Sequence, residues 1–279
     1  MKCQWESFLS LLPVRFKKDT DRLGKTALQE MRIRLGQPPQ LKFQTNCLDL
    51  SGNVTEDEIS YVINSASKFS PWAAATMSQG FLTARGGHRI GVCGKTVTSS
   101  GITTGFRDIH SLCIRVARDY PGIATDLKQI KGSILIIGPP GSGKTTLLRD
   151  LIRQRSHQNQ YAVSVVDERE ELFPEGSDSG FSSSGNMDVL HGCPKREGIL
   201  MVLRTMGPDC IAVDEITSED DCQALLTAGW CGVELLATAH AASSWELRQS
   251  PLYERLMQKK LFSNIVCLSR DKSWRIERL

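Results

Sequence analysis

The chain has 279 residues, of which 40% are hydrophobic and 23% are charged, and its formal net charge at pH 7 is +3. This composition is typical of a soluble globular protein with one large domain or two smaller ones, and it excludes a low-complexity chain. The charge is uneven, because residues 1–132 carry 18 Lys and Arg against 11 Asp and Glu, whereas residues 133–279 carry 16 against 20.

The sequence carries none of the patterns expected of an exported or membrane-spanning protein. No run of about eighteen apolar residues occurs, and residues 1–6 include an acid and lack the apolar stretch of a signal peptide. The nine cysteines are scattered without a C-x-x-C spacing. They are therefore expected to be reduced thiols in a cytosolic protein rather than disulfides or zinc ligands.

The first 120 residues mix short strands and helices, which predicts a small N-terminal α/β domain. Apolar and basic residues alternate over Met31–Leu35, the period of a half-buried strand. Thr55 and Glu58 have the spacing of a capping box and precede apolar residues at helical spacing, which predicts a helix over 56–69. A short apolar face is expected to pack on the protein's own core, with a membrane or a partner as the alternative: Trp5, Phe8, Leu9, Leu11 and Leu12.

Two later segments of this half are also predicted to be strands. Residues 81–92 place apolar stretches on both sides of a Gly-Gly pair, the pattern of a β-hairpin. Leu112, Ile114 and Val116 share one face of a further strand, so that Arg115 is expected to point away from the other three.

Residues 121–132 form a short polar stretch that is predicted to link the two halves. After them, strands that are apolar throughout alternate with helical segments, which indicates a parallel sheet covered on both faces. Residues 133–279 are therefore predicted to form a larger α/β domain with these elements in chain order: strand 133–137, helix 145–158, strand 162–166, strand 210–213, helix 219–228 and strand 233–237.

One motif matches the phosphate-binding pattern G-x-x-x-x-G-K-[ST] between a buried strand and a helix. Glycines allow successive N–H groups to turn towards phosphate oxygens, and the helix N-terminus adds the positive end of its dipole. Lys144 is expected to reach the β- and γ-phosphates of ATP, and the Thr145 hydroxyl to ligate Mg²⁺. The candidate nucleotide-binding residues are Gly138, Pro139, Pro140, Gly141, Ser142, Gly143, Lys144, Thr145 and Thr146.

Two carboxylates, Asp214 and Glu215, directly follow the predicted strand at 210–213. Asp214 is the candidate partner of Mg²⁺, and Glu215 is the candidate general base for an attacking water. A solvated helix cap is the plainer alternative, because more acids follow at 219–221. The phosphate-binding pattern upstream favours the catalytic interpretation.

Polar residues end two other predicted strands, where α/β proteins place their ligands. Asp167 and Glu168 follow the strand at 162–166, and Glu168 is a candidate catalytic residue. His240 follows the strand at 233–237 and is a candidate to contact the attacking water or a neighbouring subunit. The plainer alternatives are a charged helix start for the acids and a structural role for the histidine.

These motifs, in this order, resemble those of the secretion ATPases, the hexameric P-loop motors of type II and type IV secretion. The Walker A, acidic, Walker B and histidine boxes of that family correspond to residues 138–145, 167–171, 214–215 and 238–240. Over nearly the whole chain the sequence also resembles the stage III sporulation AA family of endospore-forming bacteria. That resemblance is carried by Met31–Pro38, Gly86–Gly91, Cys113–Arg118, Val166–Arg169, Asp188–Lys195 and Val213–Ile216.

The resemblance implies a RecA-like P-loop ATPase domain behind a small N-terminal domain, assembled with copies of itself into a ring, expected to be hexameric. It implies that the protein acts on the cytoplasmic side of a membrane, at the inner face. There it would supply energy to a channel or secretion-like complex between mother cell and forespore. It also implies that an arginine of the N-terminal domain completes the site. Arg89, Arg107, Arg115 and Arg118 are available, and Arg115 is preferred because strand alternation separates it from its apolar neighbours.

Two other functions stay open from the residues. The basic first half suits an ATPase associated with nucleic acid, but aromatic side chains for base stacking are few, so no nucleic acid is expected as a partner. A scaffold that binds nucleotide with little turnover is the second alternative. The presence of Glu215 argues against it.

Overall fold

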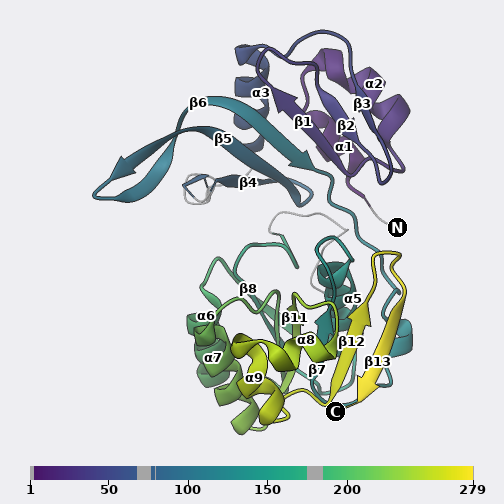
Figure 1. Cartoon of the computed structure of the whole chain (residues 1–279), viewed down its shortest axis with the longest axis vertical. Helices are drawn as coiled ribbons and strands as arrows, with labels where there is room; N and C mark the ends of the chain where they lie inside the picture. The colour runs from purple at the N-terminus through teal and green to yellow at the C-terminus, as the bar shows by residue number, and fades with distance from the viewer. Residues whose placement is uncertain (1–2, 68–76, 79, 175–184, 279) are drawn as a thin grey trace. The chain divides into compact units, whose positions relative to one another are not determined.

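The computed structural model describes residues 3–67, 77–78, 80–174 and 185–278 (Figure 1). The chain divides into two compact units, the first reaching Asp119 and the second beginning at Tyr120. Within the described residues, no helix has both the length and the apolar character needed to cross a membrane.

In the described part of the first unit, six strands form an antiparallel sheet with the order β3-β2-β1-β6-β5-β4 (Figure 1). The predicted strand at 31–35 and the predicted hairpin at 81–92 are confirmed as β1 and as the β4–β5 pair. The strands are β1 (Glu30–Arg34), β2 (Gln40–Lys42), β3 (Cys47–Asp49), β4 (Phe81–Ala84), β5 (His88–Ser99) and β6 (Ile102–Arg115).

One face of this sheet is covered by α1 (Trp5–Ser10), α2 (Val14–Gly24) and α3 (Glu56–Ser67). Helix α3 confirms the predicted helix as far as residue 67, and the Thr55 N–H donates to the Glu58 carboxylate at 2.9 Å, as in a capping box. Residues 68 and 69 of that prediction lie outside the described residues. The apolar face near the N-terminus packs into this core, as predicted, with these side chains buried: Trp5, Phe8, Leu11 and Leu12.

In the described part of the second unit, seven strands form a sheet with the order β13-β12-β7-β11-β10-β8-β9. All neighbouring pairs are parallel except β12 with β13. Strand β11 lies between β7 and β10, so the strands that carry the two main motifs are not direct neighbours. The strands are β7 (Ile134–Ile137), β8 (Val163–Asp167), β9 (Met187–His191), β10 (Cys210–Val213), β11 (Glu234–Ala239), β12 (Asn264–Leu268) and β13 (Trp274–Arg278).

Helices cover both faces of this sheet, which confirms the predicted α/β layering. Alternate residues of β7 divide between two cores: Leu135 and Ile137 lie in one, Ile134 and Ile136 in the other. Helix α5 (Lys144–Ser156) covers the face of Ile134 and Ile136. The opposite face is covered by α6 (Lys195–Thr205), α7 (Glu219–Trp230), α8 (Ser244–Gln249) and α9 (Pro251–Gln258).

The stretch 121–132, predicted as a link, packs within the second unit. It contains a single 3₁₀ turn, η1 (Thr125–Leu127), beside which Ala124 is buried together with Leu127. The Asp150 carboxylate on α5 accepts the N–H groups of Gly122 at 2.9 Å and Ala124 at 2.8 Å. Buried apolar side chains and paired backbone donors hold this stretch against α5.

Candidate functional site

The loop between β7 and α5 depends on glycine for two different reasons. Gly141 and Gly143 have φ values of +73° and +102°, a region that favours glycine. Gly138 has no room for a side chain, because an added Cβ would lie 2.6 Å from the Ser142 Oγ and 2.7 Å from the Leu268 carbonyl oxygen. The phosphate-loop pattern therefore folds as its glycines require.

The beginning of α5 leaves backbone donors at the mouth of this loop. Gly143 occupies the N-cap position and makes no side-chain hydrogen bond to the helix. The first N–H groups of a helix have no partner within it, and they carry the positive end of the helix dipole. A Cβ added at Gly141 would meet nothing within 4 Å, so the loop faces open space there. Such a surface suits an anion.

Lys144, the first residue of α5, lies over the loop with its amino group facing inward. Its Nζ donates to the carbonyl oxygens of Gly138 at 2.9 Å and Pro139 at 3.2 Å, and lies 3.1 Å from Nδ1 of His240. Burial lowers the pKa of the Lys144 amino group, and the negative charges of Asp214 and Glu215 partly oppose that shift.

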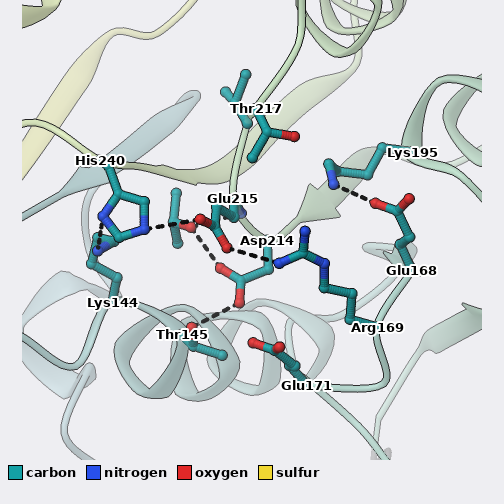
Figure 2. A network of polar contacts seen from close by, with 12 residues as sticks. Lys144, Thr145, Glu168, Arg169, Glu171, Lys195, Asp214, Glu215, Thr217 and His240 are labelled. Carbon is teal, nitrogen blue, oxygen red and sulfur yellow. Dashed lines mark hydrogen bonds and ion pairs between the residues drawn. The ribbon is translucent and has the colours of Figure 1, made fainter. Parts of the chain in front are cut away.

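Asp214, directly after β10, connects the loop to two strands (Figure 2). Its Oδ2 accepts a hydrogen bond from the Thr145 hydroxyl at 2.7 Å, and its Oδ1 accepts one from the Thr238 hydroxyl at 2.5 Å. Thr238 lies on β11, the strand between β7 and β10, which is why it can reach the carboxylate. The two sequence motifs thus meet through Asp214.

Glu215 follows Asp214 and has a left-handed backbone, with φ of +50°. Its N–H donates to the Thr238 hydroxyl at 2.8 Å, so this one hydroxyl accepts from Glu215 and donates to Asp214. Its carboxylate faces two side chains: Oε1 lies 2.9 Å from Nε2 of His240, and Oε2 lies 3.5 Å from Nη1 of Arg169 (Figure 2). The local fold therefore places Glu215 between a histidine and an arginine.

Asp167, at the end of β8, is buried, and its side chain holds the loop that follows this strand. Its carboxylate accepts the N–H groups of Glu171 at 2.9 Å, Leu172 at 3.0 Å and Phe173 at 2.8 Å. Burial raises the pKa of Asp167 to about 6, although the hydrogen bond from Phe173 opposes the shift. Because both carboxylate oxygens are occupied in this way, we assign Asp167 a structural position beside the site.

Glu168 pairs with Lys195 of α6, whose side chain is only 5% exposed. Together with the acidic pair after β10 these groups line one pocket at the carboxyl ends of β8 and β10. The lining residues are Val166, Asp167, Glu168, Arg169, Glu171, Lys195, Asp214 and Glu215.

Most of the residues singled out in the sequence come together here. Lys144, Thr145, Asp214, Glu215 and His240 are connected by the contacts described, and Glu168 lines the adjoining pocket. Arg115 is exposed at the end of β6 in the first unit, pointing away from the buried Leu112 and Ile114, as expected from strand alternation.

Three further residues contribute that the sequence analysis did not name individually as site candidates: Thr238 and Arg169, which lie in the histidine and acidic boxes, and Lys195. Thr238 stands two residues before His240 at the end of an apolar strand, and Arg169 follows the acids after β8. The signal for Thr238 and Arg169 is their position at strand ends, whereas Lys195, at the start of α6, has no such signal. A polar residue in such a position lies at the same sheet edge as the other site residues.

The residues present fit a magnesium-bound nucleotide. The hydroxyl of Thr145 and the carboxylate of Asp214 are oxygen ligands, the type that Mg²⁺ prefers. The uncapped start of α5 and the Lys144 amino group provide the donors and positive charge that phosphates need. These features lie side by side at one edge of the sheet.

Comparisons with solved structures concern the fold. The ATPase DotB of Yersinia pseudotuberculosis superposes with a TM-score of 0.62 at 16% identity, covering 96% of this chain and 79% of that chain. The pilus retraction motor PilT with bound ADP superposes with a TM-score of 0.60 at 16% identity, covering 91% and 76%. The predicted α/β fold, with a RecA-like P-loop domain after a small α/β domain, is confirmed.

Sequence comparison establishes the family. Stage III sporulation protein AA of Bacillus subtilis (strain 168) is 37% identical to this chain over 258 residues, which cover 88% of this chain and 83% of that protein. The family described as sporulation stage III, protein AA, matches residues 4–276. The chain therefore belongs to the sporulation stage III protein AA family.

Proposed function

We propose that this protein is a Mg²⁺-dependent ATPase whose site lies at the carboxyl edge of the sheet in the second unit. The observation that carries the proposal is the contact between Thr145 and Asp214. A hydroxyl at the start of the phosphate-loop helix and a carboxylate at the end of another strand meet at 2.7 Å. In P-loop enzymes this pair of groups holds the metal beside the phosphates.

In this proposal the loop residues 138–146 bind the phosphates through backbone N–H groups, and Lys144 neutralises the β- and γ-phosphates. Thr145 and Asp214 hold Mg²⁺, which, when bound, reduces the negative charge on the phosphate oxygens. Glu215 orients a water and accepts its proton. His240 holds the Glu215 carboxylate, since its Nε2 lies 2.9 Å from Oε1.

Two further residues have supporting roles in this proposal. Glu168 fixes the pocket wall through its pair with the buried Lys195. Arg115 is exposed and projects from a sheet. We propose that it acts on the site of the same or a neighbouring copy, as arginines do when they stabilise negative charge on a transferring phosphate.

We also propose that the protein works as a homo-oligomer, expected to be a hexameric ring, at the cytoplasmic face of a membrane. The fold shared with the ATPase DotB and with the pilus retraction motor PilT supports motor activity. The family of sporulation proteins supports a channel or secretion-like complex of the developing spore as the partner.

Calorimetric titration with ATP and Mg²⁺, together with phosphate release, tests the enzymatic proposal. The wild-type chain is expected to bind and hydrolyse ATP, whereas Lys144→Ala should weaken binding by roughly 100-fold, the effect of losing a buried charge-assisted contact. Lys259→Ala, which removes an exposed lysine after α9, is the matched control and should behave like the wild type. A well-folded wild-type protein that binds no nucleotide would overturn the proposal.

The assembly proposal has its own test. If Arg115 acts between copies, turnover per protomer should rise with protein concentration, in step with the mass measured by light scattering. Equal turnover per protomer in a strictly monomeric sample would contradict a shared site.

A further inference from the structure

The loop that follows β8 is held from two sides, which fixes the position of Arg169. Asp167 accepts three N–H groups from residues 171–173 on one side. On the other side Arg149 of α5, itself buried, donates from Nε to the Leu172 carbonyl at 2.5 Å and from Nη2 to the Glu171 carbonyl at 2.6 Å. The loop is thereby tied to the helix that begins at the phosphate loop.

The side chain of Arg169 contrasts with this fixed backbone. It is 47% exposed, and its Nη1 lies 3.5 Å from Oε2 of Glu215. An exposed ion pair at that separation contributes little to stability, because water screens its two charges. The guanidinium can therefore leave Glu215 at little cost, although its attachment point stays in place.

The other cations around this pocket are engaged more firmly. Lys195 is 5% exposed and pairs with Glu168, and Lys144 donates to two carbonyl groups of its own loop. Among the described residues that line the pocket, Arg169 is the exposed cation that faces the acidic pair (Figure 2).

From this arrangement we propose that Arg169 binds the terminal phosphate of the bound nucleoside triphosphate from within the same chain, exchanging Glu215 for a phosphate oxygen. The inference rests on the proposed function. A triphosphate carries several negative charges, and the planar guanidinium fits two phosphate oxygens at once, so phosphate competes well against a single exposed carboxylate.

This exchange would have a second effect on the same site. When Arg169 moves to the phosphate, Oε2 of Glu215 loses its cationic partner while Oε1 keeps His240. One carboxylate oxygen then becomes available to a water. Arrival of a third phosphate would thus release the general base, and a diphosphate, which ends short of that position, would not.

The experiment compares the full-length chain with Arg169→Ala, Arg169→Lys and a matched control, Arg196→Ala. Arg196 is also an exposed arginine paired with an acid, Asp220, and lies on α6. Each protein is titrated in Mg²⁺ with ADP and with ATPγS, an analogue that keeps three phosphates, and turnover of ATP is then measured.

We expect Arg169→Ala to bind ATPγS roughly 10- to 100-fold more weakly while its affinity for ADP changes less than about 3-fold. Turnover should fall by about 10³-fold, as for other arginines that stabilise the phosphate charge. Arg169→Lys should lie between Arg169→Ala and the wild type, because an ammonium keeps the charge but not the two-point contact. Arg196→Ala should match the wild type.

Unchanged ATPγS affinity and turnover in Arg169→Ala would overturn the inference and leave the proposed ATPase intact. Faster turnover in that variant would also overturn it, because Arg169 would then only restrain Glu215. A wild-type chain that binds neither probe would instead refute the proposed function itself, and this inference with it.

Discussion

Nε2 of His240 lies 2.9 Å from Oε1 of Glu215, on loops that follow the adjacent parallel strands β11 and β10. The other ring nitrogen, Nδ1, lies 3.1 Å from the Lys144 amino group, which can only donate. Nδ1 is therefore the acceptor, and Nε2 carries the proton that is donated to Glu215. The imidazole links the phosphate-loop lysine to the acidic pair.

Removing this link should slow turnover. His240→Ala is expected to lower kcat by about 10- to 100-fold, because Glu215 loses the donor that orients it, while the KM for ATP changes less than kcat. His240→Gln, whose amide can donate, should recover part of the loss. The exposed His110→Ala serves as control, and a His240→Ala enzyme with wild-type kcat would contradict the prediction.

The hydroxyl of Thr238 is predicted to matter for stability and for turnover. Thr238→Val keeps the shape but leaves Oδ1 of Asp214 and the N–H of Glu215 without this partner at a buried position. The free energy of unfolding should fall by about 1–3 kcal/mol, and kcat should fall as well. Urea unfolding and phosphate release check both effects, and Thr238→Ser, which retains the hydroxyl, should restore them. A Thr238→Ser protein as damaged as Thr238→Val would refute the role of the hydroxyl.

Two glycines of the phosphate loop should respond differently to alanine. Gly138→Ala forces a Cβ to within 2.7 Å of the Leu268 carbonyl oxygen and should destabilise the protein by about 1–3 kcal/mol or more. The Cβ of Gly141→Ala would lie in open space, so the only cost is the left-handed φ of +73°. That conformation should lower the free energy of unfolding by about 1 kcal/mol. Thermal unfolding of both variants checks the order. Greater damage from Gly141→Ala would contradict it.

The first unit contains a buried histidine, from which we expect the stability of the protein to depend on pH. His88 is fully buried, its Nε2 lies 3.0 Å from the Gln4 carbonyl oxygen, and its Nδ1 accepts the Ala117 N–H at 3.1 Å. These bonds require the neutral ring, and burial lowers the pKa of His88 to about 4. Between pH 6.5 and 4 the unfolded chain therefore binds more protons than the folded chain.

Stability should consequently fall as the pH is lowered through that window, by up to about 3 kcal/mol from this residue. Urea unfolding of the wild type and of His88→Gln at several pH values between 7.5 and 4.5 measures the difference. The variant is expected to be less stable at pH 7.5 but to show a shallower decline. Identical slopes for the two proteins would show that His88 does not titrate in this way.

Local patterns predicted much of the fold and of the candidate site. The phosphate loop can be recognised in the sequence because its backbone requires glycine at fixed spacing. Strand β10 can be recognised because its four residues are all apolar, as expected of a strand that is buried on both faces. Strands β12 and β13 were not predicted. Residues 265–268 of β12 are apolar throughout, but the sequence alone gives no sign that β12 pairs with β7, more than a hundred residues earlier.

Contacts between distant residues account for the remaining differences. The sequence shows Asp167 at a strand end, where a site carboxylate and a loop-building carboxylate look the same. Only the folded chain shows three N–H groups occupying it. The stretch 121–132 reads as polar, and most of it is exposed, yet Ala124 and Leu127 are buried in the core that α5 covers. The role of Thr238 depends on β11 lying between β7 and β10, an order that no local pattern reveals.

The placement of β11 also sets the dimensions of the site. Neighbouring strands lie about 4.8 Å apart, so β7 and β10, two intervals apart, are separated by roughly 10 Å. That width is maintained by the backbone ladder of three strands, and substitution of surface side chains leaves it unchanged. Sequence changes in the loops at the rim can therefore alter what the site contacts without changing the spacing between the phosphate loop and the acidic pair.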